Sequence, residues 1–357
     1  SIFHSLGRHP IAGMAAAFAG VSGGFSANLL IGTIDPLLAG LSTEAANIID
    51  PDYYVMPTAN YYFMAVSTFL ITFLGAWVTN RWVEPRLGKY EGDVTPEEIV
   101  PLTTVERRGL RNTGIAALVW GALILAGILP ENGLLRGADG TILHSPLLKG
   151  FIAFLFLSAS TLGIVYGYTV GTFKKSADVI DGMSSSFKTL VSFLVLVFFA
   201  AQFVAWFQWS NLGVLLAING ADLLRSLNIG LIPLVIIFVI FSGFINLFMG
   251  SASAKWAIMG PIFIPIFMLL GYSPELSQAV YRVGDSITNI ISPMMSFFAL
   301  IIVFFQKYQK NAGFGTIMAN MLPYSIAFFI GWVLLLILWI ILGLPLGPES
   351  PINYIPS

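Results

Sequence analysis

The chain has 357 residues, 57% of them hydrophobic and 10% charged, and its mean hydropathy is +0.84. Soluble domains carry about 25% charged residues, so this composition excludes an ordinary water-soluble fold and predicts an integral membrane protein. The net charge of −1 argues against a nucleic acid partner, which requires a basic surface, and the absence of cysteine excludes disulfides and thiol chemistry.

Long apolar stretches follow one another along the chain. The first two, 10–40 and 51–82, are interrupted by glycine, serine, asparagine, aspartate and proline. Uninterrupted stretches that approach or reach the length needed to span a bilayer, about 20 residues, follow at 112–130, 149–173 and 190–209. Interrupted stretches return at 228–271 and 272–308, and an uninterrupted one comes last, at 322–345. We therefore predict an all-α, polytopic membrane protein.

The interrupted stretches are the informative ones. Irregular backbone inside a bilayer survives only where protein or a water-filled cavity satisfies its polar groups, so broken segments usually mark a binding site. We predict two re-entrant helical hairpins, each followed by a broken helix. This pattern is typical of solute transporters.

The two interrupted regions share a weak internal repeat. Asn-Leu-x-x-Gly occurs at 28–32 and again at 246–250, and each copy is followed by a proline with aromatic residues after it, Pro57 and Pro293. We interpret this as an inverted repeat. The predicted organisation is a first repeat over 1–90, connecting transmembrane helices over 91–225, a second repeat over 226–312 and a final transmembrane helix over 313–357.

Charged residues at bilayer depth cost at least ~2.5 kcal/mol each and are by default candidates for function. Asp35, Lys255, Arg282 and Asp285 are of this kind. Arg282 and Asp285 are three residues apart and share a helix face, so they are expected to pair with each other or to point into one cavity.

Asp35 and Asp285 are candidates to line a central site and to bind or release a coupling cation, either a proton or sodium. The structural alternative is that Arg282 and Asp285 form a buried pair and that Asp35 caps a helix before Pro36. We favour a functional role for Asp285 and leave both interpretations of Asp35 open. Arg282 could instead anchor an anionic solute, because a guanidinium group matches a carboxylate.

Other polar residues have weaker signals. The amide oxygens of Asn28 and Asn246 could coordinate a cation, although asparagine also joins helices in membrane bundles. Lys255 is expected to extend toward the membrane surface, and Trp256 either lies at that surface or stacks on an aromatic solute.

Two intramembrane proteases are rival interpretations. Val283-Gly284-Asp285 is similar to the Gly-x-Gly-Asp element of intramembrane aspartyl proteases, but Arg282 replaces the first glycine. Gly20-Val21-Ser22-Gly23 fits the rhomboid serine protease motif, but the required base is missing because His144 lies in a polar connection. An ion channel would tolerate polar membrane residues too, but paired re-entrant segments fit alternating access better. Transport is therefore preferred over catalysis.

Two blocks of sequence resemble the p-aminobenzoyl-glutamate transporter (AbgT) family. The first is Ser22-Gly23-Gly24-Phe25-Ser26-Ala27-Asn28-Leu29-Leu30-Ile31-Gly32-Thr33-Ile34-Asp35-Pro36. The second is Gly250-Ser251-Ala252-Ser253-Ala254-Lys255-Trp256, followed by Tyr281-Arg282-Val283-Gly284-Asp285-Ser286. The resemblance runs along the whole chain.

The resemblance implies a homodimer of nine-helix subunits in the cell inner membrane, in contact with lipid, and residues ahead of Ser1. It implies that the solute pathway is lined by Asp35, Asn246, Trp256, Pro274, Arg282, Asp285 and Pro293. Asn246 and Asp285 are then the expected ligands of a bound sodium ion, while Asp35 and Asp285 fit a proton-handling pair equally well. No organic cofactor is expected.

The resemblance also implies two directions of transport: export of sulfonamide antimetabolites, or uptake of p-aminobenzoyl-glutamate for folate metabolism. Both solutes carry an aminoaryl ring, which suits stacking on Trp256, and the glutamate conjugate adds carboxylates, which suit Arg282. We expect ion-gradient-driven sulfonamide efflux, with uptake of the folate precursor as the alternative.

Overall fold

The computed structural model describes residues 2–92, 94, 101–130, 132–137, 145–227, 229–293, 295 and 298–356. His144 lies outside these residues. Within them the chain is helical, with two isolated β-bridges and no strand, so the prediction of an all-α fold is confirmed. The chain divides into two compact units, one formed by residues 1–99 and 196–357 and the other by residues 100–195.

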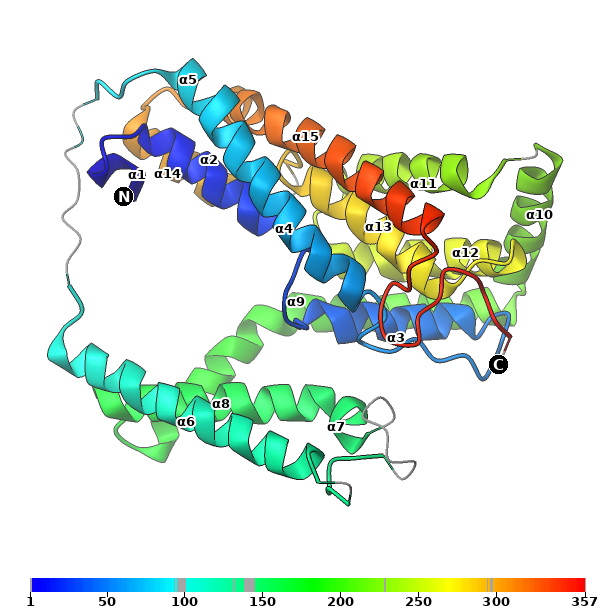
Figure 1. Ribbon diagram of the computed structural model, residues 1–357, viewed down its shortest axis with the longest axis horizontal. Coiled ribbons are helices and arrows are strands. Elements are labelled where there is room, and N and C mark those ends of the chain that lie inside the picture. The colour runs from blue at the N-terminus through cyan, green and yellow to red at the C-terminus, as the bar shows by residue number, and fades with distance from the viewer. Residues whose placement is uncertain are drawn as a thin grey trace. The chain divides into compact units, whose positions relative to one another are not determined.

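The first unit begins with short helices and ends with a long one (Figure 1). Its N-terminal elements are α1 (Ile2–Ser5), α2 (Pro10–Phe18), the π-helical turn η1 (Ala19–Gly23), α3 (Ile34–Ala46), α4 (Tyr61–Val78), η2 (Thr79–Val83) and α5 (Glu84–Leu87). Its C-terminal elements are α10 (Leu212–Ser226), α11 (Leu231–Asn246), α12 (Ala252–Leu269), α13 (Pro274–Asn289), α14 (Phe298–Tyr308) and α15 (Phe314–Ile341).

The second unit contains α6 (Thr104–Ile128), α7 (Pro146–Lys149), α8 (Phe151–Val170) and the first part of α9 (Ser176–Trp209). Thr103 caps α6 in a reciprocal capping box with Glu106. Helices α6 and α8 pack closely where Gly109 meets Tyr166 and Val170. Gly109 is the one fully buried residue of α6, and the other residues of this helix are half-buried or exposed.

Five helices in the described ranges are long and apolar enough to cross a membrane: Tyr61–Leu87, Thr104–Ile128, Ala153–Val170, Ala252–Leu269 and Phe314–Ile341. They include the helices predicted around 112–130, 149–173 and 322–345. The predicted stretch 190–209 lies in the second half of α9. The chain is therefore a multi-pass membrane protein.

Two helical hairpins occupy the places predicted from the interrupted sequence. The first hairpin is α2–η1 and α3, joined by the non-helical residues 24–33, and the second hairpin is α11 and α12, joined by residues 247–251. One Asn-Leu-x-x-Gly element lies at each connection. Asn28 lies within the first connection, whereas Asn246 is the last residue of α11. The inverted relation and the boundaries of the repeats stay predictions.

Helix α13 forms the centre of the first unit, although its composition is polar. All of its residues except Thr288 are buried, and it packs against α11, α12, α15, α3 and η1 (Figure 1). Its approach to α11 depends on Gly284, where a Cβ would overlap Ser242 Oγ and lie 2.5 Å from the carbonyl oxygen of Val239. Small residues at such a crossing let two membrane helices come close together.

Candidate functional site

A line of polar side chains runs along one face of α13. We name this line the polar stripe: Glu275, Gln278, Arg282, Asp285 and Asn289, whose exposed fractions are 3%, 2%, 2%, 1% and 3%. The spacing of three or four residues places them on one helical face. At 1.5 Å per residue the stripe is about 21 Å long. Buried polar groups on this scale need partners, which the two hairpins and the segment before α4 supply.

The ends of α13 are set by local sequence. Ser273 is the N-cap, and its hydroxyl accepts a hydrogen bond from the N–H of Leu276 at 3.2 Å. Pro274 follows at the first helical position, where its missing N–H has no cost. Beyond Asn289 the helix stops, and Pro293 is exposed in the break before α14. The two prolines thus lie on either side of the polar stripe, Pro274 buried and Pro293 exposed.

Arg282 pairs with Asp35 of the first hairpin. Arg282 Nη1 lies 2.6 Å from Asp35 Oδ1, and the other carboxylate oxygen accepts the N–H of Gly32 at 2.6 Å. Asp35 is in the first turn of α3, where the helix dipole favours a negative charge. Asp35 therefore makes a helix-terminal contact, as in the structural alternative, and also forms a buried ion pair with Arg282.

Only the Nη1 atom of the Arg282 guanidinium group contacts Asp35. Its Nε and Nη2 atoms are buried and have no hydrogen-bond partner among the described residues. Buried N–H groups without partners are costly, so this edge of the guanidinium is suited to a ligand with two acceptor oxygens.

Lys255 is the largest departure from the sequence interpretation. The expectation that it extends to the membrane surface is wrong: its side chain is fully buried, and its ammonium group contacts Asp285 Oδ1 and Asn246 Oδ1. The structural alternative, a buried pair between Arg282 and Asp285, is wrong as well, because Arg282 binds Asp35 and Asp285 binds Lys255. Periodicity along one helix could not reveal these pairs, because each partner comes from a different hairpin.

Asn246 holds the second hairpin to the end of the polar stripe. Its Nδ2 donates to the carbonyl oxygen of Asp285, to Thr288 Oγ1 and to Asn289 Oδ1, each at 2.8 Å. Asn28 is placed differently: it is half-exposed, and its amide donates to the carbonyl of Phe25 at 3.3 Å, inside the first connection. The structure therefore brings Asn246 to Asp285 and gives Asn28 a local contact instead.

Trp256 is fully buried and is not at a membrane surface. Its ring stacks on Tyr281, with centroids 4.5 Å apart and an interplanar angle of 25°. Its Nε1 donates to Ser42 Oγ at 2.8 Å, and Ser42 in turn donates to Gln278 Oε1 at 2.6 Å. Gln278 also donates to Asn60 Oδ1 at 2.8 Å. This network joins both hairpins to the polar stripe in a closed arrangement.

The donor atoms proposed for sodium have the right chemistry. Asn246 Oδ1 and Asp285 Oδ1 are hard oxygen ligands, and they converge on one cationic position. The ammonium group of Lys255 is the cation that they hold here. A sodium ion would therefore compete with an internal cation for these oxygens.

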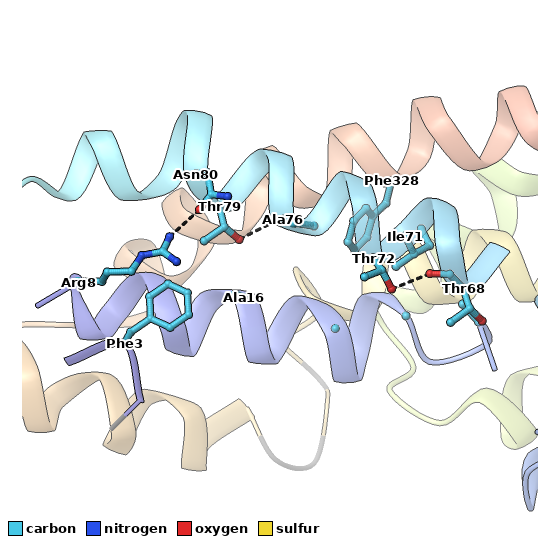
Figure 2. A pocket seen from close by; sticks show the side chains of 14 residues that line it. Phe3, Arg8, Ala16, Thr68, Ile71, Thr72, Ala76, Thr79, Asn80 and Phe328 are labelled. Atoms are coloured by element: carbon cyan, nitrogen blue, oxygen red, sulfur yellow. Dashed lines mark hydrogen bonds between the residues drawn. The ribbon is translucent and has the colours of Figure 1, made fainter. Parts of the chain in front are cut away.

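A separate cleft of about 410 Å³ lies between the first hairpin and α4, lined by Phe3, Arg8, Ala16, Gly20, Gly24, Ala27, Thr68, Ile71, Thr72, Gly75, Ala76, Thr79, Asn80 and Phe328 (Figure 2). Arg8 donates to Asn80 Oδ1 at 2.5 Å near one end, and Thr72 donates to the carbonyl of Thr68 at 2.7 Å near the other. None of the predicted site residues lines this cleft. The buried cluster around α13 instead contains Asp35, Asn246, Trp256, Arg282 and Asp285.

Sequence reasoning missed Glu275, Gln278, Ser42 and Asn60. For the first two a signal was present, because polar residues recur every three or four positions from 275 to 289. Ser42 and Asn60 carry no such signal, because their partners become neighbours only after the hairpins pack against α13.

Comparison with known proteins agrees with this architecture. Residues 1–354 match the family model described as "AbgT putative transporter family". The chain is 40% identical over 348 residues to the p-aminobenzoyl-glutamate transport protein of Escherichia coli K12, covering 97% of this chain and 68% of that protein.

Two solved structures are similar to this one. The YdaH transporter of Alcanivorax borkumensis matches with a TM-score of 0.91 and 48% identity, over 97% of this chain and 73% of that one. The MtrF protein of Neisseria gonorrhoeae, which represents a class of antimetabolite efflux pumps, matches with a TM-score of 0.88 and 50% identity. The match covers 98% of this chain and 71% of that one.

The relatives are transporters rather than enzymes, which excludes both protease interpretations. This chain, with its two hairpins packed against the polar stripe of α13, belongs to the AbgT family of membrane transporters.

Proposed function

We propose that this transporter exports sulfonamide antimetabolites, driven by an ion gradient, and that Arg282 holds the polar group of the solute. The observation that carries this proposal is the free Nε and Nη2 edge of Arg282, which is buried beside the Asp35 pair. Two N–H groups on one guanidinium edge match two oxygens on one atom, as in a sulfonyl group or a carboxylate. The similarity to MtrF supports the direction of transport.

Uptake of p-aminobenzoyl-glutamate is the second candidate. The Escherichia coli relative supports this solute, and its carboxylates would fit the same edge of Arg282. Trp256 is proposed to contact the aminoaryl ring of either solute. In the present conformation Tyr281 covers the indole ring, so this contact requires that the stacked pair separates during the transport cycle.

The coupling ion is proposed to act on the two buried ion pairs. Protonation of Asp35 or Asp285 would remove the charge that holds Arg282 or Lys255. Sodium at Asn246 and Asp285, with Asn28 as a further candidate ligand, would displace the Lys255 ammonium group. Either event weakens contacts between a hairpin and α13, which is the change that alternating access requires.

Pro274 and Pro293 are proposed to belong to the solute pathway because they lie beyond the two ends of the polar stripe. We further propose a homodimer in the cell inner membrane, in contact with lipid, with a separate pathway in each subunit. This assembly and location are what the family resemblance implies.

The test is solute flux in liposomes. The protein is reconstituted, and fluxes of radiolabelled sulfonamide and p-aminobenzoyl-glutamate are measured under proton and sodium gradients imposed separately. Arg282→Gln should raise the KM for both solutes by about tenfold or more, because a charged hydrogen bond is lost. Arg107→Gln, which changes an exposed arginine of α6, is the matched control.

Each outcome has a distinct meaning. Gradient-driven sulfonamide flux supports the proposed solute, and the gradient that drives it identifies the ion. Flux of p-aminobenzoyl-glutamate alone selects the second candidate. An unchanged KM in Arg282→Gln, with the protein folded, rejects Arg282 as the solute anchor.

A further inference from the structure

Glu275 is a buried carboxylate at the first turn of α13 that the transport scheme above does not use. It is 3% exposed, and its carboxylate accepts a hydrogen bond from the Tyr53 hydroxyl at 3.0 Å. The nearby Ser273 hydroxyl donates elsewhere, to the carbonyl oxygen of Pro351 at 2.6 Å. No cationic side chain pairs with Glu275 among the described residues.

The other two buried carboxylates of the site differ from Glu275 in this respect. Asp35 is paired with Arg282, and Asp285 is paired with Lys255. An ionised carboxylate that is buried beside a cation is stabilised as a charge, whereas one without a cation is costly to keep ionised. Of the three, Glu275 is therefore the carboxylate that no cation compensates among the described residues.

The elements packed against α13 bring few charges to Glu275. Helices α11 and α15 and the turn η1 contain no Asp, Glu, Lys, Arg or His, and the titratable residue of α15, Tyr324, bonds to Thr79. Helix α3 contributes Asp35, which faces Arg282, and Glu44, which is exposed. Helix α12 contributes Lys255, which faces Asp285 about 15 Å further along the stripe at 1.5 Å per residue.

Tyr53 connects this carboxylate to the protein surface. It is half-buried in the connection between α3 and α4, and its ring lies 5.7 Å from that of Tyr354. Tyr354 is half-buried and donates to Asp50 Oδ2 at 2.8 Å. The hydroxyl that donates to Glu275 thus belongs to a side chain that reaches partly exposed residues, whereas Glu275 itself does not.

Glu275 is also attached to the network that closes the site. Its backbone carbonyl accepts the Asn60 amide at 2.9 Å, and Asn60 accepts from Gln278. Gln278 accepts in turn from Ser42, which holds Trp256. A change of charge on the Glu275 side chain therefore occurs next to the hydrogen bonds that connect α13 to Asn60, Ser42 and Trp256.

We propose that Glu275 carries the coupling proton of the transport cycle and exchanges it with the aqueous side through the Tyr53 hydroxyl. In the loading step the Tyr53 O–H bond breaks and a new O–H bond forms on Glu275 Oε2, while a hydronium ion on the aqueous side gives its proton to the Tyr53 oxygen and leaves as water. Release is the reverse. This inference rests on the proposed function, and it assigns proton coupling to a residue other than Asp35 and Asp285.

The first test is Glu275→Gln in proteoliposomes, since glutamine keeps the size and an acceptor oxygen but cannot carry a proton. Flux driven by a pH gradient should fall by about tenfold or more, while exchange of labelled for unlabelled solute at equal pH stays within about twofold of wild type. Glu44→Gln, an exposed glutamate of α3, should behave as wild type in both assays. Loss of both activities to the same extent, or of neither, would overturn the assignment.

A second variant keeps the proposal testable if Glu275→Gln does not fold. Tyr53→Phe removes a single hydroxyl and should shift the pH at which transport is half-maximal. An unchanged pH profile contradicts the proton route through Tyr53.

A third measurement separates this proposal from the choice of solute. Proton exchange on solute binding is followed with a pH-sensitive dye in detergent, for wild type and for Glu275→Gln. Wild type should exchange protons and the variant should not, and equal exchange in both would overturn the role of Glu275. Sulfonamide flux that responds only to a sodium gradient overturns it too, while leaving sulfonamide transport intact. Absence of flux for both solutes rejects the proposed function instead.

Discussion

Asp35 and Arg282 join the first hairpin to α13 through an ion pair in which Oδ1 and Nη1 are 2.6 Å apart and both side chains are nearly inaccessible. The pair formed by Arg8 and Glu84 is different, because those side chains are 35% and 23% exposed. A buried charge whose partner is removed stays desolvated, whereas an exposed one returns to water. The two pairs should therefore respond very differently to substitution.

Asp35→Asn should lower the stability of the folded protein by about 3 kcal/mol, because Arg282 is left as an uncompensated buried charge. Arg8→Gln should cost less than about 1 kcal/mol. Thermal unfolding of the purified protein in detergent measures both. The double variant Asp35→Asn with Arg282→Gln should recover part of the loss, and simple addition of the two single effects would show that the pair does not interact.

Lys255→Met should abolish transport and destabilise the protein by several kcal/mol, because it removes the cation that compensates the buried Asp285 carboxylate. A lysine that extended to the membrane surface would tolerate methionine, since its hydrocarbon part already lies in apolar surroundings. Lys174→Met, at an exposed lysine, is the matched control. Normal solute flux by Lys255→Met would remove the Lys255–Asp285 pair from the mechanism.

Gly284→Ala should push α13 away from α11, because the new methyl group would overlap Ser242 Oγ and meet the carbonyl oxygen of Val239. The expected result is a marked drop in thermal stability together with loss of flux. Gly163→Ala in α8 is a useful comparison, since nothing lies within 4 Å of the added atom. That variant should be as stable as wild type or slightly more stable, because alanine favours a helix over glycine by about 0.5–1 kcal/mol. Equal behaviour of the two variants would contradict the close crossing.

Ser42→Ala should destabilise the protein by about 1–3 kcal/mol, because it removes the partner of the Trp256 indole N–H and of the Gln278 side-chain oxygen in a buried site. Ser158→Ala is the control, since the one hydrogen bond of the Ser158 hydroxyl among the described residues goes to the carbonyl of Leu155 in its own helix. Unfolding curves of the two variants, recorded beside wild type, provide the comparison. A Ser42→Ala protein as stable as the control would mean that this hydroxyl does not hold Trp256 in place.

The composition and the apolar stretches of the chain were enough to predict the fold class, because a bilayer accepts only backbone that satisfies its own hydrogen bonds. The interruptions within 10–40 and 228–271 could be recognised for the same reason, since glycine and polar residues at membrane depth break a helix. Asp35, Arg282 and Asp285 could be singled out as well, because a charge in an apolar stretch is costly wherever its partner lies.

The pairing of those charges was decided only by the tertiary structure. Helical spacing made Arg282 and Asp285 possible partners. In the structure Arg282 pairs with Asp35 of the first hairpin, and Asp285 pairs with Lys255 of the second hairpin. A buried charge pairs with the nearest opposite charge in space, and sequence distance does not report that quantity. Glu275 is a further example. Its spacing in the sequence places it on the polar stripe, but only the packing of the helices shows that no cationic side chain contacts it among the described residues.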